Sequence, residues 1–189
     1  MNALEKVAIV GKITDDALEE VKILCAQFNH TKREKNKFEY NYSATEVYHA
    51  KKGAVQTAIR IGRVLFNRKH EDYIDFSILN TILGGYLGSR LMSSIREDKG
   101  YTYGVGSGVV QLQDTGYFFI STEVGEEYKD ATVQAIKKEI QLLQSEVVSA
   151  NELDLVRNYI TGQILKNSDG AFAQMDRFLS VEKYDMDLS

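Results

Sequence analysis

The chain contains one cysteine and no proline, and both shortages exclude whole classes of protein. A single thiol, Cys25, cannot form a disulfide framework or a zinc site built from several cysteines. Proline averages about 5% of residues, and its absence excludes Pro-rich linkers and collagen-like segments. Cys25 lies in an apolar stripe with no neighbour that would activate it, so we interpret it as a core thiol.

Charge and hydrophobicity exclude further classes. The 23 Lys and Arg against 27 Asp and Glu leave a net charge of −4, which gives no basic surface for nucleic acid or anionic lipid. No apolar run approaches the roughly 20 residues that span a bilayer, and residues 1–6 lack the order of a signal peptide. The length of 189 residues and the 43% hydrophobic content suit one domain, residues 1–189, that binds neither nucleic acid nor membrane.

Apolar spacing in the first third of the chain predicts both strands and helices. The run Val7–Val10, followed by a glycine, predicts a strand buried on both faces. Thr14 has the features of a helix N-cap and precedes an amphipathic stripe that continues to Phe28. Strict alternation of apolar and polar residues predicts strands at Phe38–Tyr42 and Val55–Ile61.

The remaining sequence predicts helices around one β-hairpin. The helices are expected at residues 71–83, 88–97, 128–143, 150–164 and 171–183. Gly100 would end the second of these in the left-handed conformation, and Ser149 with Glu152 forms a capping box for the fourth. The hairpin strands are expected at residues 101–111 and 117–124. Because strands and helices do not strictly alternate, the expected fold class is α+β.

Local motifs for metal, phosphate or nucleophilic chemistry are missing from the sequence. His30, His49 and His70 stand in neither H-E-x-x-H nor H-x-x-E-H spacing, and we interpret them as surface residues. The glycines of Gly104–Gly108 lack the order of a dinucleotide fingerprint and instead indicate close backbone approach. No G-x-S-x-G element is present. Residue chemistry alone therefore identifies no enzyme.

One long stretch carries a specific pattern. From Asn80 to Tyr103 it reads NTILGGYLGSRLMSSIREDKGYTY. It meets every fixed position of N-x-x-L-G-G-x-x-x-S-R-L-x-x-x-[IL]-R-E-x-x-G-x-x-Y, a pattern of the insulinase/pitrilysin family of zinc peptidases, which includes the mitochondrial processing peptidases. Over residues 6–185 the chain resembles the C-terminal half-domain of that family.

The resemblance implies a fold, a cofactor and a partner. The fold is a mixed, mostly antiparallel sheet with helices packed on one face, the half-domain of the processing-peptidase-like metallohydrolases. In the family two such halves face each other, and the N-terminal half holds zinc through H-x-x-E-H and a distal glutamate. This chain has no such motif, so the resemblance implies zinc in the other half and no metal or cofactor here. It also implies that the chain is an excerpt of a longer protein.

The resemblance implies two site residues, Arg96 and Tyr103, which match the family's arginine and tyrosine seven residues apart. A phenol O–H can donate to a scissile carbonyl, and a guanidinium can orient a carbonyl or carboxylate. Tyr101 is a rival for the tyrosine role, and alternation places it on the same strand face as Tyr103. The alternative interpretation is a surface arginine paired with Glu97 or Asp98 and a tyrosine in the core.

Three functions are compatible with these features. The leading hypothesis is the non-zinc-binding half of a zinc metallopeptidase, inactive alone, with a zinc-bearing N-terminal half and a peptide substrate as partners. The second is a non-catalytic structural or interaction subunit that has lost the zinc chemistry. The third, a regulatory ligand-binding domain of ferredoxin-like type, rests only on the α+β pattern.

Overall fold

The computed structural model describes residues 6–28 and 44–184 and divides the chain into two compact units. The first unit combines Met1–Asn41 with Ile164–Ser189, and the second comprises Tyr42–Gln163. The single domain expected from the sequence stays a prediction. The strand expected around Tyr40 lies outside the described residues.

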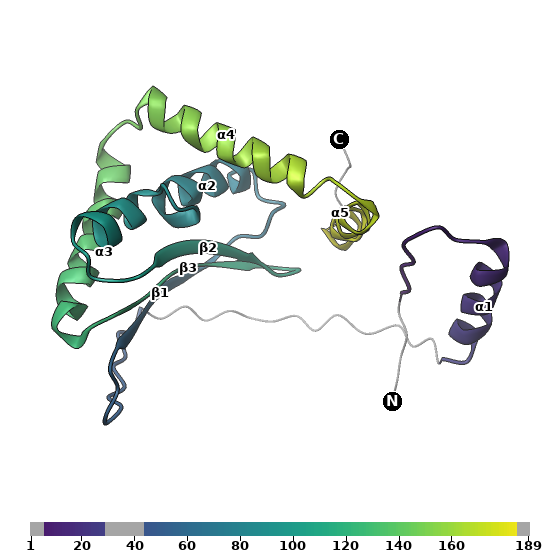
Figure 1. The fold of residues 1–189 in the computed structure, drawn as a ribbon, viewed down its shortest axis with the longest axis horizontal. Helices are drawn as coiled ribbons and strands as arrows, with labels where there is room; N and C mark the ends of the chain where they lie inside the picture. Colours follow the sequence, from purple (N-terminus) through teal and green to yellow (C-terminus); the bar gives the residue numbers. More distant parts are fainter. Residues whose placement is uncertain (1–5, 29–43, 185–189) are drawn as a thin grey trace. The chain divides into compact units, whose positions relative to one another are not determined.

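A three-stranded antiparallel sheet, counted over the described residues, forms the base of the second unit (Figure 1). Its strands are β1 (Thr57–Leu65), β2 (Val105–Gln111) and β3 (Gly116–Val124), in the order β1-β3-β2. The β2–β3 hairpin confirms the predicted pair of strands. Its first strand begins at Val105 rather than Tyr101, because the chain bends before it enters the sheet.

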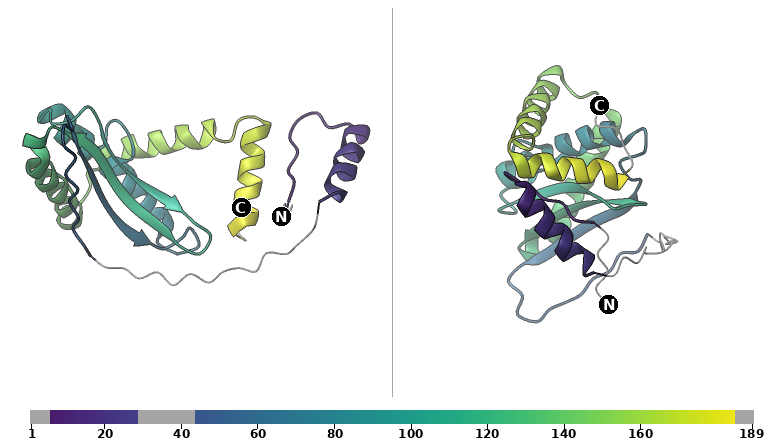
Figure 2. Two further views of the ribbon diagram at one scale, coloured as in Figure 1. Left: turned by 90° about the horizontal axis from the view of Figure 1, so that it is seen from below. Right: turned by 90° about the vertical axis from the view of Figure 1, so that its right-hand side faces the viewer.

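Helices cover one face of this sheet, as Figures 1 and 2 show. They are α2 (Tyr73–Asn80), the π-helical segments η1 (Thr81–Gly85) and η2 (Met92–Asp98), the short 3-10 helix η3 (Glu126–Tyr128), α3 (Lys129–Ser145) and α4 (Ala150–Lys166). The core between helices and sheet consists of Leu83, Leu91, Met92, Ile95, Val105, Ile120, Ala135 and Ile136. The expected antiparallel α+β arrangement with helices on one face is confirmed. None of the described helices is long and apolar enough to cross a bilayer.

The first unit contains α1 (Asp15–Ala26) and α5 (Ala171–Tyr184). Thr14 caps α1 as predicted, because its hydroxyl accepts a hydrogen bond from the Ala17 N–H at 3.3 Å. None of the residues of α1 is fully buried, and Cys25 is half-buried. The α5 helix confirms the prediction for residues 171–183.

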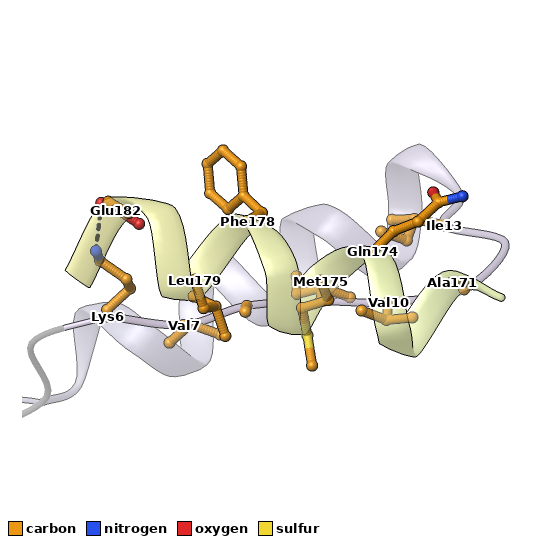
Figure 3. A pocket seen from close by; sticks show the side chains of 13 residues that line it. Lys6, Val7, Val10, Ile13, Ala171, Gln174, Met175, Phe178, Leu179 and Glu182 are labelled. Atoms are coloured by element: carbon orange, nitrogen blue, oxygen red, sulfur yellow. Dashed lines mark ion pairs between the residues drawn. The ribbon is translucent and has the colours of Figure 1, made fainter. Parts of the chain in front are cut away.

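An extended segment, Lys6–Ile13, runs alongside α5 in this first unit (Figure 3). Lys6 and Glu182 form an ion pair, and a hollow of about 580 Å³ lies between segment and helix. The buried strand predicted here is wrong, since Val7 is 46% and Ile9 39% exposed. The residues have the apolar character of a strand, but a strand also needs a hydrogen-bonded neighbour, and no described strand pairs with them.

An ion pair connects the segment between η1 and η2 to α4. The Nε and Nη2 atoms of Arg90 donate to the two carboxylate oxygens of Glu152, each at 2.8 Å. The two side chains are only 18% and 26% exposed. The predicted capping box is therefore half right, because Ser149 Oγ accepts from the Glu152 N–H while the Glu152 carboxylate binds Arg90. Hydrogen bonding between Arg90 and Glu152 is the main reason why the pKa of Glu152 is lowered and the pKa of Arg90 is raised.

Gly84 allows the end of η1 to touch the edge strand β2. A Cβ atom at Gly84 would lie 2.6 Å from both Ser107 N and Ser107 Oγ, and 2.9 Å from a methyl group of Leu91. The Ser107 hydroxyl also donates to the Asn80 carbonyl oxygen at 3.2 Å. Because the closest contact is to backbone, only glycine fits here without a shift of the strand.

Removal of the Glu152 charge is expected to destabilise the chain. Glu152→Gln should lower the free energy of unfolding by about 1–3 kcal/mol, because it leaves the largely buried Arg90 guanidinium without its counter-charge. Asp154→Asn is the control, since its ion pair with Arg157 on the same helix is 61% and 72% exposed. The control should cost less than about 0.5 kcal/mol. Equal losses in urea unfolding would contradict the prediction.

The same pair should make stability fall in acid. Arg90 lowers the pKa of Glu152 below its ordinary value of 4.5, so the contribution of the pair is fully present above that pH. It is lost as the pH falls from 4.5 through the lower pKa of the folded chain. The free energy of unfolding of Glu152→Gln should therefore decline less over this range than that of the wild type. Parallel pH curves for the two proteins would show that the pair does not contribute.

Two glycine substitutions should change the free energy of unfolding in opposite directions. Gly84→Ala should cost about 1–3 kcal/mol of unfolding free energy, because its methyl group would overpack against β2. Gly162→Ala, in the exposed interior of α4 with no atom within 4 Å of the new Cβ, should stabilise the chain. The expected gain is about 0.5–1 kcal/mol, because alanine favours the helix. Chemical unfolding of both variants tests this, and a tolerated Gly84→Ala would show that β2 can move.

Candidate functional site

The motif from Asn80 to Tyr103 divides into residues that build the fold and residues that the fold leaves exposed. Its buried side chains, all at most 6% exposed, are those of Ile82, Leu83, Ser89, Leu91, Met92 and Ile95. Arg90 is held by α4, and Gly84 by its contact with β2. In contrast, Arg96 is exposed and Tyr103 is 92% exposed. The two predicted site residues are therefore not part of the core.

Arg96 projects from η2, which is anchored by the fully buried Ile95 next to it. Gly100 then reverses the chain with a φ of 65°, as predicted, and the Tyr101 N–H donates to the Ile95 carbonyl oxygen at 3.1 Å. Among the described residues, Arg96 has no ion pair with the two acidic residues that follow it. Arg96 is thus a surface arginine, as the alternative interpretation expects, but it lacks the ion pair with Glu97 or Asp98 that this interpretation adds.

Tyr103 occupies a bend whose two neighbouring residues are tied to β3. The Thr102 hydroxyl donates to the Glu123 carbonyl oxygen at 2.7 Å and accepts from the Gly104 N–H at 3.1 Å. The hydroxyl of the buried Thr122 lies 2.9 Å from the Gly104 carbonyl oxygen, to which it can donate. Because the backbone is held on both sides, the phenol of Tyr103 projects outward from the bend.

Tyr101 does not share a face with Tyr103, which corrects the prediction from alternation. The ring of Tyr101 packs against the hydrophobic core and stacks on Tyr128, with ring centroids 4.7 Å apart. The alternation rule fails because this part of the chain is bent rather than extended. The alternative interpretation expected Tyr103 in the core, but it is 92% exposed, and the tyrosine that packs on the core is the partly buried Tyr101.

A shallow polar hollow of about 230 Å³ lies beside Tyr103. It is lined by Gln56, Arg60, Thr102, Tyr103, Gly104, Ser121, Thr122 and Glu123. Arg96 does not belong to this lining. The hollow thus brings Tyr103 together with Arg60 of β1, but not with Arg96.

Arg60 is fixed in this hollow by the backbone of two paired strands. Its Nη1 atom donates to the carbonyl oxygens of Ile59 and Thr122 at 3.0 and 3.1 Å. Its Nη2 atom lies 3.6 Å from a carboxylate oxygen of Glu123, and both side chains are more than half exposed. The guanidinium is therefore held by backbone groups and loosely paired at its outer end.

Glu126 organises the chain where β1 begins. The Thr57 hydroxyl donates to Glu126 Oε2, and Lys129 Nζ donates to Oε1 at 3.1 Å. The hydrogen bond from Thr57 lowers the pKa of Glu126 most, and the hydrogen bond from Lys129 lowers it further. The same Lys129–Glu126 hydrogen bond raises the pKa of Lys129. Lys129 also lies 4.7 Å from the ring centre of Tyr48. The cluster therefore fixes the start of the strand that carries Arg60.

The described residues do not fit a zinc site. Within residues 6–28 and 44–184, no three His, Cys, Asp or Glu side chains are grouped so that they could hold a metal ion. His49 is exposed, and the exposed His70 stacks on Phe66 with ring centroids 4.2 Å apart. His30 lies outside the described residues. The side chains that remain for chemistry are hydrogen-bond donors rather than metal ligands.

The sequence analysis missed Arg60, Glu123 and the hydroxyl pair of Thr102 and Thr122. One signal was present, because Arg60 alternates with the inward-facing Ile59 in a clear strand pattern. That pattern places Arg60 on the outer face of the sheet but does not say which strand lies beside it. The neighbour follows from the pairing of β1 with β3, which places Arg60 opposite Ser121, 61 positions away in the sequence.

Known proteins share this fold and part of this sequence. The chain is 25% identical over 171 residues to the uncharacterized zinc protease YmxG of Bacillus subtilis (strain 168). The matched region covers 90% of this chain and 42% of that protein. A peptidase M16 inactive domain from Pseudomonas fluorescens superposes with a TM-score of 0.67 and 28% identity, over 72% of this chain and 32% of that one. A protease from Helicobacter pylori, 19% identical, has the same fold with a TM-score of 0.77 over 93% of this chain and 44% of that one.

The chain spans less than half the length of each of these proteins. Residues 6–160, most of the sequence, match the family described as the peptidase M16 inactive domain. This match confirms the resemblance to the insulinase/pitrilysin zinc peptidases that the motif indicates. The chain therefore belongs to the peptidase M16 inactive-domain family.

Proposed function

We propose that this chain is the substrate-positioning half of a zinc metallopeptidase. It would act with a zinc-bearing half, on the same polypeptide or on a separate subunit. One observation carries the proposal: among the described residues, the fold leaves the side chains of Arg96 and Tyr103 exposed and without a hydrogen bond or ion pair. The zinc protease among the relatives supports zinc in the parent enzyme.

The role proposed for Tyr103 follows from its phenol. The O–H group would donate a hydrogen bond to the carbonyl oxygen of the scissile peptide bond. This bond strengthens as negative charge develops on that oxygen, so it stabilises the transition state more than the bound substrate. Because Thr102 and Gly104 hold the backbone on both sides, little reorganisation is needed when the substrate arrives.

The role proposed for Arg96 is orientation of the peptide. Its planar guanidinium can donate two parallel hydrogen bonds to a carbonyl or carboxylate group. Burial of Ile95 fixes the segment from which Arg96 extends. The hydrolytic chemistry itself belongs to the zinc-bearing half, and we expect this chain alone to cleave nothing.

Substitution of the two residues tests the proposal in a complex with the zinc-bearing half. Tyr103→Phe removes only the hydroxyl and should lower kcat by about 10²-fold with little change in KM. Arg96→Ala should lower kcat/KM, and Arg96→Lys should restore only part of it, because lysine lacks the fork geometry. Steady-state hydrolysis of a fluorogenic peptide measures all three.

A matched control is available in the same bend. Tyr101→Phe removes a hydroxyl from the tyrosine that packs on the core and should keep kcat within about twofold. Because Arg96 and Tyr103 are exposed, their variants should unfold at the wild-type urea concentration. Wild-type rates in both Tyr103→Phe and Arg96→Ala would refute the proposal.

The partner half decides between this function and that of a non-catalytic subunit. An H-x-x-E-H motif with a distal glutamate in that half would support the peptidase, and degenerate ligands in an otherwise similar half would support a scaffold. The ferredoxin-like alternative rested only on the α+β pattern, which membership of the M16 family now explains.

A further inference from the structure

We propose that Arg60 determines specificity, by selecting peptides that present a carboxylate next to the residue bound at Tyr103. The proposal rests on the function proposed above and names the substrate class. Its basis is the hollow of about 230 Å³ that Arg60 and Tyr103 line together. That volume suits one side chain or chain end rather than a separate ligand.

Arg60 is prepared to bind an anion. Its Nη1 atom donates to the Ile59 and Thr122 carbonyl oxygens, which fixes the plane of the guanidinium before any ligand arrives. A group that is already ordered loses less conformational entropy on binding. The outer Nη2 atom remains available, because its only contact is a loose one.

That contact, with Glu123, is weak enough to be exchanged. The distance of 3.6 Å exceeds that of a hydrogen bond, and the two side chains are 56% and 58% exposed. Exposed ion pairs of this kind contribute about 0–1 kcal/mol. A substrate carboxylate that binds Nη2 directly would therefore displace Glu123 at little cost.

The other polar side chains of the hollow can also serve an anionic group, and the preference for an anion rests on Arg60 and its loosely held partner Glu123. Gln56, Ser121 and Tyr103 can each donate a hydrogen bond, as can Arg60, whereas Glu123 is the only carboxylate in the lining. Among the described residues that line the hollow, Glu123 is the one negative charge that could attract a basic side chain. The basic preference is therefore the competing outcome of the test.

Peptide binding measures this preference without cleavage. The complex with the zinc-bearing half is stripped of metal by a chelator, so that peptides stay whole. Fluorescence anisotropy then compares labelled ten-residue peptides that differ only by Glu, Gln or Lys at one position, which is moved along the peptide. At one position the Glu peptide should bind about five- to tenfold more tightly.

Three variants assign the preference to Arg60. Arg60→Gln should abolish the Glu-over-Gln preference, whereas Arg60→Lys should restore part of it. Glu123→Gln should increase the ratio, because it removes the competing carboxylate. Arg157→Gln, an exposed arginine of α4, is the matched control and should keep the wild-type ratio.

Peptides with a free or amidated C-terminus distinguish the two sources of a carboxylate. If only peptides with a free C-terminus bind more tightly, the hollow binds the carboxylate of a chain end. If peptides with an internal Glu bind more tightly, it binds the carboxylate of a side chain. An unchanged ratio in Arg60→Gln, or a Lys preference that Glu123→Gln removes, would overturn the proposal. Failure of the function proposed above is separate, because it shows as wild-type hydrolysis in Tyr103→Phe and Arg96→Ala.

Discussion

Burial of the η2 segment against the sheet is the constraint from which the exposed site follows. Leu91, Met92 and Ile95 are at most 5% exposed and belong to the same cluster as Ile120 of β3 and Ile136 of α3. Each such side chain contributes about 1.5–3 kcal/mol when it is fully buried. Arg96 follows Ile95 on this anchored segment and is itself exposed, so the buried side chains hold the backbone from which Arg96 extends. Close contact of Gly84 with β2 and the ion pair of Arg90 hold the preceding loop in the same way.

Hydrogen bonds hold the bend around Tyr103 in place, whereas burial of apolar side chains holds η2. Between Gly100 and Val105 the chain has no regular hydrogen bonds, and the hydroxyls of Thr102 and Thr122 supply them instead. Buried hydroxyls that are fully paired give rigidity, because any other arrangement would leave a polar group without a partner. A rigid bend is what a catalytic or binding side chain requires, since a loosely held phenol would lose much of its effect.

In the function proposed here, the second unit supplies only part of a site. Its candidate residues are donors, Arg60, Arg96 and Tyr103, and the described residues contain no grouped metal ligands. Donors of this kind orient a substrate and stabilise charge, but they do not generate a nucleophile. In the function proposed here, the nucleophile comes from a second half, and the M16 relatives are more than twice as long as this chain.

Features that depend on neighbours in the sequence were predictable from the 189 residues, and features that depend on distant ones were not. The Thr14 cap, the left-handed Gly100 and the β2–β3 hairpin follow from local hydrogen bonds and backbone sterics. The long motif was specific enough to indicate the family and the exposed arginine and tyrosine. The strand expected near Val7, the face of Tyr101 and the partner of Glu152 were wrong, because each depends on which remote segment packs beside it. Arg60 was missed for the same reason. The alternating pattern predicts that Arg60 lies on a strand, but strand pairing across about 60 residues brings Thr122 and Tyr103 next to it. Sequence spacing does not predict that pairing.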